Sequence, residues 1–154
     1  MVFRYDNGSD VQSIDIGEGG VRASRFLVLG SMDKQVKILS LDQSNLMVPL
    51  STQLLPDRPA SICLTTPMSI NEPMRVEIGL ANGFLVRSLL DSSGVIIDTR
   101  THVLASRPVR CQRIRLGEET KPLTLCCTSR PWLARSATLT PLRFVCNGVR
   151  EKQR

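Results

Sequence analysis

Residues of the types that carry out covalent chemistry are present in this 154-residue chain, but their pattern forms no catalytic arrangement. His102 is the only histidine, so a Ser-His-Asp or Cys-His arrangement would depend on it alone. Asp91 with Asp98, or Glu118 with Glu119, could form acid–base pairs, but turn and surface roles explain them, since nothing places them in a cleft. The sequence therefore predicts no catalytic residue and no enzyme.

The cysteines and glycines do not form a recognisable binding motif. The five cysteines include no C-x-x-C pair, so neither a disulfide framework nor a zinc site is indicated. The glycines at 17, 19 and 20 lack the following Lys-Ser or Lys-Thr of a phosphate-binding loop. We predict buried thiols, no metal and no cofactor. The cysteines are Cys63, Cys111, Cys126, Cys127 and Cys146.

Positive charge is concentrated in the last third of the chain. The formal net charge is +6, but residues 107–154 carry 11 Lys or Arg against 3 Asp or Glu. A basic segment can bind nucleic acid or an acidic partner, although a solvated face is the commoner explanation. The candidate contacts for nucleic acid or a protein partner are Arg110, Arg113 and Arg115. Strand alternation separates Arg110 from the other two, and few aromatic residues accompany them, so we expect only weak, unspecific binding to nucleic acid.

One hairpin pattern recurs along the chain, and the strands that it predicts must position the candidate contact arginines. Residues 79–91, GLANGFLVRSLLD, predict two strands joined by a tight turn at Asn82-Gly83, because Asn and Gly tolerate positive φ. The pattern returns 49 residues earlier in residues 30–42 and 48 residues later in residues 127–136. The chain is therefore predicted to be built from repeats.

Each repeat predicts about four antiparallel strands in 48 or 49 residues, which is the size of a β-propeller blade. In the last repeat the outer two strands are expected at 132–139 and 141–145. A β-sandwich also uses short antiparallel strands, but it gives no reason for turns and Arg-Pro pairs to recur at one interval. We expect an all-β fold, a β-propeller fragment of about three four-stranded antiparallel blades whose ring is not closed. The predicted parts are a partial or first blade at 1–57, a second blade at 58–106, a third blade at 107–147 and a charged tail at 148–154.

Five segments of the chain resemble one protein family. They are VKILSLD at 36–42, IGLANGFLVRSLLD at 78–91, DTRTHVLASRPVR at 98–110, SRPWL at 129–133 and LTPL at 139–142. Together, over about residues 26–142, they resemble the second propeller region of a family of large β-propeller subunits. This family includes subunits of splicing factor 3b, of damage-specific DNA-binding protein, and of the cleavage and polyadenylation specificity factor. The match to the splicing factor 3b member is close.

The resemblance implies a noncatalytic scaffold that takes part in pre-mRNA splicing. Its partners would be other splicing-factor proteins in a multi-subunit complex, and its location would be the nucleus. The alternative is a propeller segment that binds nucleic acid, as in damage recognition or RNA 3′-end processing. No apolar run approaches the roughly 18 residues of a membrane-spanning helix, so no membrane partner is expected.

Overall fold

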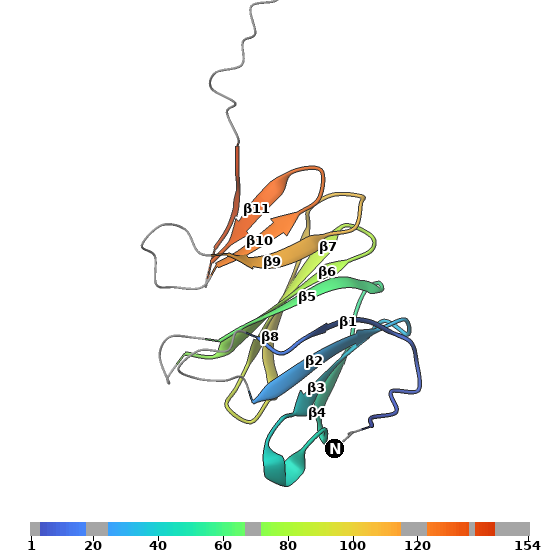
Figure 1. Cartoon of the computed structure of the whole chain (residues 1–154). Coiled ribbons are helices and arrows are strands. Elements are labelled where there is room, and N and C mark those ends of the chain that lie inside the picture. The colour runs from blue at the N-terminus through green and yellow to red at the C-terminus, as the bar shows by residue number, and fades with distance from the viewer. Residues whose placement is uncertain (1–3, 18–24, 67–71, 115–122, 136–137, 144–154) are drawn as a thin grey trace, which may run out of the picture.

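Three four-stranded antiparallel sheets make up the structure, a computed structural model. The structure describes residues 4–17, 25–66, 72–114, 123–135 and 138–143, and the statements below concern those ranges. In each sheet, strands that follow one another in the chain are neighbours. The predictions of an all-β fold and of a β-propeller fragment are confirmed, since the sheets fan out side by side without closing a ring (Figure 1).

The strands of the first sheet are β1 (Val11–Asp15), β2 (Phe26–Ser31), β3 (Gln35–Ser40) and β4 (Pro49–Leu54). A short 3-10 helix, η1 (Gln43–Asn45), joins β3 to β4. The second sheet contains β5 (Pro59–Thr65), β6 (Met74–Leu80), β7 (Phe84–Leu90) and β8 (Ile96–Val103). The third contains β9 (Arg110–Ile114), β10 (Leu123–Cys127), β11 (Pro131–Ala134) and β12 (Leu139–Pro141). No helix among the described residues is long and apolar enough to cross a membrane.

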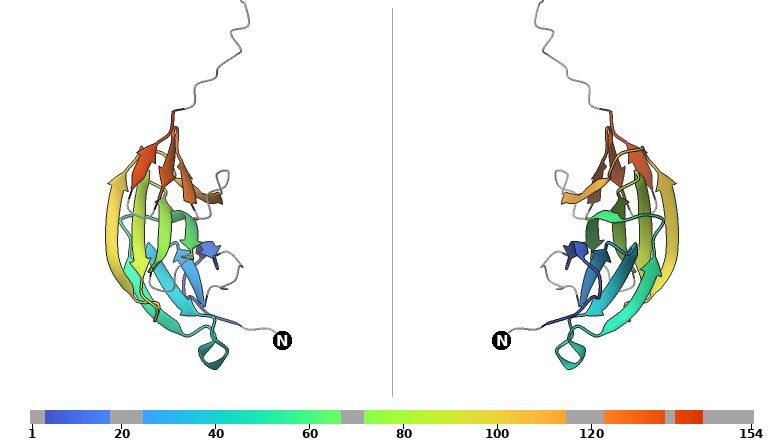
Figure 2. Two further views of the ribbon diagram at one scale, coloured as in Figure 1. Left: turned by 90° about the vertical axis from the view of Figure 1, so that its left-hand side faces the viewer. Right: turned by 90° about the vertical axis from the view of Figure 1, so that its right-hand side faces the viewer.

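The first strand of each sheet lies on one side of the molecule and the last strand on the other. Figure 2 shows β1, β5 and β9 on one side, with β4 and β8 opposite them. The successive strands of each sheet therefore run from an inner to an outer position, as in a propeller blade.

The turn after the second strand has the same form in the first two sheets. Its last residue has a positive φ, +62° at Lys34 and +93° at Gly83. The N–H of Lys34 donates to the carbonyl of Ser31 at 3.1 Å, and that of Gly83 donates to the carbonyl of Leu80 at 3.3 Å. The predicted two-residue turn is instead a three-residue turn, because Ala81 also lies outside both strands.

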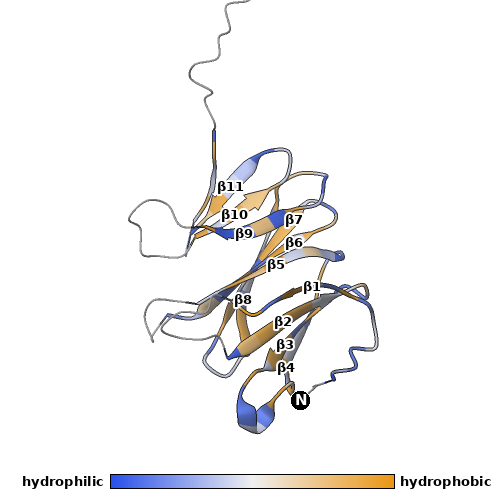
Figure 3. Ribbon diagram, viewed as in Figure 1, coloured by the Kyte–Doolittle hydropathy of each residue, from blue (hydrophilic) through white to orange (hydrophobic). Residues whose placement is uncertain are grey.

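Apolar side chains fill the spaces between neighbouring sheets, because alternate residues of a strand point to opposite faces. The buried residues between the first and second sheets include Val28, Ile38, Ile62, Val76 and Ile78. Those between the second and third sheets are Leu85, Val109, Cys126 and Ala134. Figure 3 shows hydrophobic residues concentrated in the strands and hydrophilic ones in many of the connecting turns.

Two glycines allow the sheets to approach one another. A Cβ atom at Gly79 would lie 2.1 Å from the carbonyl oxygen of Val109, and one at Gly30 would lie 2.6 Å from the ring of Pro59. Both distances are far shorter than a van der Waals contact. The glycines that open the predicted hairpins are therefore needed where each sheet packs against the next.

The free flank of the first sheet is partly covered by the segment that precedes β1. Tyr5 packs against a buried cluster of Leu27, Leu29 and Leu39. The Nζ atom of Lys37 donates to the backbone carbonyl of Asn7 at 3.1 Å and to its side-chain oxygen at 2.9 Å. This segment therefore shields apolar surface that an open ring would otherwise leave to solvent.

The outer hairpin of the third sheet is shorter than the sequence predicted. The strands expected at 132–139 and 141–145 are replaced by β11, which ends at Ala134, and by β12, which covers only Leu139–Pro141. Within the first predicted strand the N–H of Arg135 donates to the carbonyl of Thr138 at 2.9 Å, so these two residues pair with each other instead of continuing one strand. Residues 136 and 137 lie outside the described residues.

Candidate interaction site

A polar contact joins the first strands of the three sheets. The Oδ2 atom of Asp15 in β1 accepts a hydrogen bond from the N–H of Leu64 in β5 at 2.7 Å. The same oxygen forms an ion pair with Arg113 in β9, and Arg113 donates to the carbonyl of Leu64 at 3.1 Å. The charges of the carboxylate and the guanidinium therefore compensate each other, and Leu64 in β5 forms a hydrogen bond with each group.

The predicted contact arginines lie on or beyond β9. Arg110 is exposed, and its Nη1 atom donates to the carbonyl of Ala60 at 3.2 Å. Arg113 is mostly buried, with 24% of its side chain exposed. Arg115 lies outside the described residues. The structure thus brings Arg110 and Arg113 to β5, where their described hydrogen bonds join the second and third sheets.

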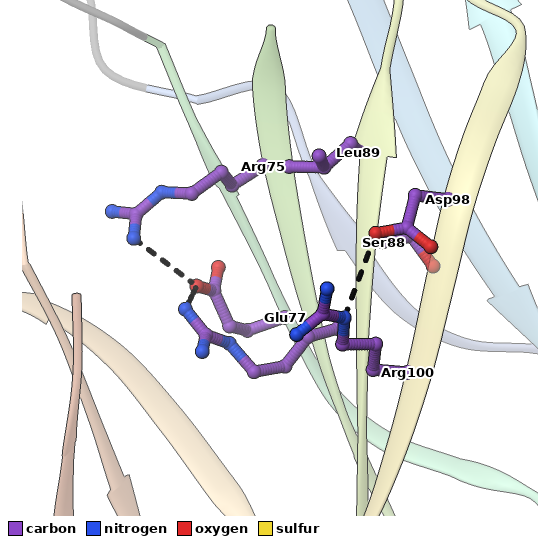
Figure 4. Close-up of a pocket in the computed structure, with 7 residues that line it drawn as sticks. Arg75, Glu77, Ser88, Leu89, Asp98 and Arg100 are labelled. Carbon is purple, nitrogen blue, oxygen red and sulfur yellow. Dashed lines mark ion pairs between the residues drawn. The ribbon is translucent and has the colours of Figure 1, made fainter. Parts of the chain in front are cut away.

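A pocket of about 190 Å³ lies on the face of the second sheet that is turned toward the third (Figure 4). Three strands of one sheet supply its walls, and arginine is the commonest side chain there. The lining residues are Arg75, Glu77, Arg87, Ser88, Leu89, Asp98 and Arg100.

Among the described residues, the outer hairpin of the third sheet is shorter than the strands of the second sheet that it faces. Strands β7 and β8 have 7 and 8 residues, whereas the facing β11 and β12 have 4 and 3. Arg87 spans the interface at this point, since its guanidinium donates to the carbonyls of Thr138 at 3.3 Å and of Arg135. Arg87 therefore joins the second sheet to the residues that flank the outer hairpin of the third, and the described residues that line the pocket all belong to the second sheet.

A buried carboxylate forms the floor of the pocket. The side chain of Glu77 has no exposed surface, and its Oε1 atom lies 3.5 Å from Arg87 and 3.9 Å from Arg75. Burial raises the pKa of the Glu77 carboxyl above its ordinary value, while the two arginines oppose that shift. Burial also lowers the pKa of Arg75. Hydrogen bonding of the carboxylate with Arg87 and Thr124 also opposes the rise of the Glu77 pKa.

This pocket was missed in the sequence. Its signal is the presence of charged residues inside otherwise apolar strands, namely Glu77 in MRVEIGL and Arg87 in FLVRSLL. Charged residues are almost never fully buried unless they are paired, so two such positions in neighbouring strands indicate a partner across the sheet.

His102 and the described cysteines lie in packed surroundings. Burial, followed by the nearby Arg87 and Arg100, lowers the pKa of His102. Burial raises the pKa of Cys63 to about 12, so its thiolate is strongly disfavoured at neutral pH. No group of three or more His, Cys, Asp or Glu side chains in the described ranges could hold a metal ion.

The chain also matches known proteins. Residues 3–146 match the family described as the RSE1/DDB1/CPSF1 second beta-propeller. Splicing factor 3B subunit 3 of Danio rerio is 39% identical over 142 residues, which cover 81% of this chain and 11% of that protein. Its Drosophila melanogaster counterpart is 37% identical, covering 81% of this chain and 12% of that protein. Pre-mRNA-splicing factor prp12 of Schizosaccharomyces pombe is 35% identical, and the match covers 83% of this chain and 11% of that protein.

A solved structure of lower sequence identity has a similar fold. BamB from Moraxella catarrhalis has a TM-score of 0.57 and 13% identity, covering 90% of this chain and 38% of that one. This likeness concerns the fold alone.

The fold, the repeats and the sequence match define a β-propeller segment of a multi-propeller protein class. The chain belongs to the RSE1/DDB1/CPSF1 second beta-propeller family, because the match spans all the described strands. It spans only 11% to 12% of the length of the relatives above.

Proposed function

We propose that this chain is a noncatalytic scaffold segment that binds other proteins of a nuclear pre-mRNA splicing complex. The observation that carries the proposal is the 35–39% identity to relatives that are all named as splicing factors. A surface made of three packed sheets suits a binding role, since the loops and outer strands of a propeller present broad faces to partners.

Affinity purification tests the proposal. A tagged form of the chain is expressed in cells, recovered from nuclear extract, and its bound proteins are identified by mass spectrometry. We expect splicing-factor proteins to be enriched. Gly79→Leu is the matched control, because a side chain there would collide with the Val109 carbonyl and separate the second and third sheets. The proposal would be contradicted if the two forms recovered splicing proteins equally well, or if neither form recovered them.

The nuclear location is tested separately. A fluorescent fusion of a full-length protein that contains this segment is expected to accumulate in the nucleus and to overlap with a splicing marker. A uniform distribution outside the nucleus would argue against the splicing role.

Direct binding to nucleic acid is a second candidate function, favoured by the exposed position of Arg110 and by the basic last third of the chain. The structure assigns Arg113 to an ion pair with Asp15, which reduces the charge available for phosphate contacts. We therefore expect no RNA or DNA binding tighter than about 10⁻⁴ to 10⁻⁶ M at physiological salt.

A titration of labelled RNA and duplex DNA at two salt concentrations separates the two functions. The Arg110→Gln and Arg115→Gln variants are measured beside the unmodified chain. Nanomolar, sequence-selective binding that these substitutions abolish would favour the nucleic-acid function. Weak binding that decreases steeply with salt in all three proteins is the expected result.

A further inference from the structure

We propose that β8, the outer edge of the second sheet, binds the same strand of a second copy of this chain. The two strands would lie antiparallel about a two-fold axis and join the two second sheets into one continuous sheet. The inference concerns self-association, and it does not depend on the splicing function proposed above.

Strand β8 lies at an edge of its sheet. It pairs with β7 on its inner side, and no described strand pairs with its outer side. Figure 2 shows it, in yellow, as the outermost strand on its side of the molecule. The consecutive residues 97–101 are all exposed, and 55% of Ile97 is accessible. An exposed edge strand is a ready template for pairing with a strand of another chain.

The outer strands of the other two sheets are less suited to pairing. Strand β12 has only 3 residues. Strand β4 has no two adjacent exposed residues, and it begins with Pro49, which has no N–H to donate. Among the described outer strands, β8 therefore offers the longest exposed edge.

The main chain of β8 presents hydrogen-bonding groups to the outer side. In an antiparallel pair, the N–H and C=O of alternate residues point toward the neighbouring strand, and those of the residues between them point away. The N–H of Leu104, just after β8, donates to the carbonyl of Gly83 at 3.1 Å and continues the register of β7 and β8. Counting back by twos, Arg100 turns its main chain toward β7, so Thr99 and Thr101 turn theirs outward.

The charged side chains of β8 complement those of a second copy. The exposed run at 97–101 is centred on Thr99, and a two-fold axis at Thr99 places Asp98 of each copy opposite Arg100 of the other. Directly opposite residues lie on the same face of a sheet, close enough for an ion pair. Both side chains are accessible, with 48% of Asp98 and 73% of Arg100 exposed. Their present pairing within one strand, at 3.7 Å, would extend into a neutral group shared by the two copies.

Neighbouring registers bring like charges together. Moving one strand by two residues still lets the outward main-chain groups face each other, but it places Asp98 opposite Asp98 or Arg100 opposite Arg100. Like charges directly opposite each other destabilise a sheet. A single charge on the edge would oppose self-pairing, whereas an acid and a base two residues apart favour one register. In that register the outward N–H and carbonyl of Thr99 would exchange hydrogen bonds with Thr99 of the second copy.

Sedimentation velocity of the purified 154-residue chain at increasing concentration tests the inference. We expect an equilibrium between monomer and dimer. Asp98→Arg and Arg100→Asp each place like charges opposite one another, so each variant alone should raise the dissociation constant of the dimer by at least about tenfold. Arg130→Asp is the matched control, because it makes the same change of charge in the exposed turn between β10 and β11. It should dimerise like the unmodified chain.

A mixture of the two charge variants separates a specific contact from a general effect of charge. At these positions Asp98→Arg carries two arginines and Arg100→Asp carries two aspartates. An equimolar mixture should therefore form a heterodimer with an affinity close to that of the unmodified dimer. Recovery of association in the mixture would also show that both variants are folded.

Amide hydrogen exchange locates the contact. The N–H of Thr99 points outward, so its exchange should slow as the protein concentration increases. Thr52, an exposed residue of the edge strand β4, is the control. Its N–H also points outward, because the N–H of Leu55 donates to the carbonyl of Lys34 at 2.7 Å and fixes the alternation along β4. Exchange at Thr52 should not depend on concentration.

Several results would overturn the inference. They are a chain that stays monomeric at every concentration, a mixture of the charge variants that does not associate, and an exchange rate at Thr99 that does not depend on concentration. A monomeric chain would leave the edge to a strand of a different protein. The inference survives a failure of the splicing-complex purification, because these measurements use the chain alone.

Discussion

The guanidinium of Arg87 lies 3.5 Å from the buried carboxylate of Glu77 and donates to backbone carbonyls of the third sheet. One side chain therefore neutralises a buried charge and joins two sheets. Only 12% of it is exposed, so its interactions are weakly screened by solvent.

Replacing Arg87 by Met should lower the free energy of unfolding by about 3 kcal/mol, because it removes the nearer cation of a buried ion pair and leaves Arg75, at 3.9 Å, as the cation beside Glu77 among the described residues. Urea denaturation measures the change. Arg100→Met is the control, since its ion pair with Asp98 is exposed and should contribute less than about 1 kcal/mol. Equal effects of the two substitutions would contradict the role assigned to Arg87.

Glu77 should give the stability of the protein a characteristic pH dependence. Because its pKa is raised from 4.5 in the folded state, the folded protein holds this proton more tightly than the unfolded chain does. The contribution of Glu77 to stability is therefore greatest below pH 4.5 and is lost as pH rises through the folded pKa. Unfolding of the unmodified chain and of Glu77→Gln is compared across this range. The free energy of unfolding of the unmodified chain minus that of Glu77→Gln should decrease with increasing pH. A difference that stays constant would refute the raised pKa of Glu77.

The two equivalent turns should respond in opposite ways to substitution. Lys34 has a φ of +62°, a conformation that costs a residue with a side chain roughly 1 kcal/mol. Lys34→Gly should therefore raise the midpoint of thermal unfolding. Gly83→Ala should lower it, because a Cβ atom there would lie 2.0 Å from the carbonyl oxygen of Ala105. The prediction is wrong if both substitutions shift the midpoint in the same direction.

Cys63 should resist alkylation in the folded protein. Burial raises its pKa to about 12, so almost none of it is thiolate at pH 8, and the side chain is inaccessible. With iodoacetamide, peptide mass spectrometry should show Cys127, which is only half-buried, labelled before Cys63. In urea both should react at similar rates. Rapid labelling of Cys63 without denaturant would show that β5 is not packed as described.

The repeated hairpins could be predicted because their signals are local. Turn residues and strand patterns at 30–42 and 79–91 correspond to β2–β3 and β6–β7. The aspartate that ends each pattern also has a local role. The Oδ1 atom of Asp42 accepts from the N–H of Ser44 at 3.2 Å, and that of Asp91 accepts from the N–H of Ser93 at 2.9 Å.

The candidate site could not be predicted, because it depends on contacts between distant parts of the chain. The pocket lies beside the short strands β11 and β12, and the sequence pattern predicted longer strands there. The role of Arg113 likewise depends on Asp15, 98 residues away. The blade boundaries near 57 and 106 stay predictions, and the tail at 148–154 lies outside the described residues.

The contact among Asp15, Leu64 and Arg113 has a consequence for the order of the blades. These residues are spaced by 49 positions each, so they occupy the same place in three successive repeats. The same place holds an acid, an apolar residue and a base, and an identical residue in all three could not form this contact. The blades have therefore diverged into parts that are no longer interchangeable. Swapping the first and third would preserve every hairpin and the register, yet it would place the arginine beside the N–H of Leu64 and the aspartate beside its carbonyl, so that neither could form its present hydrogen bond.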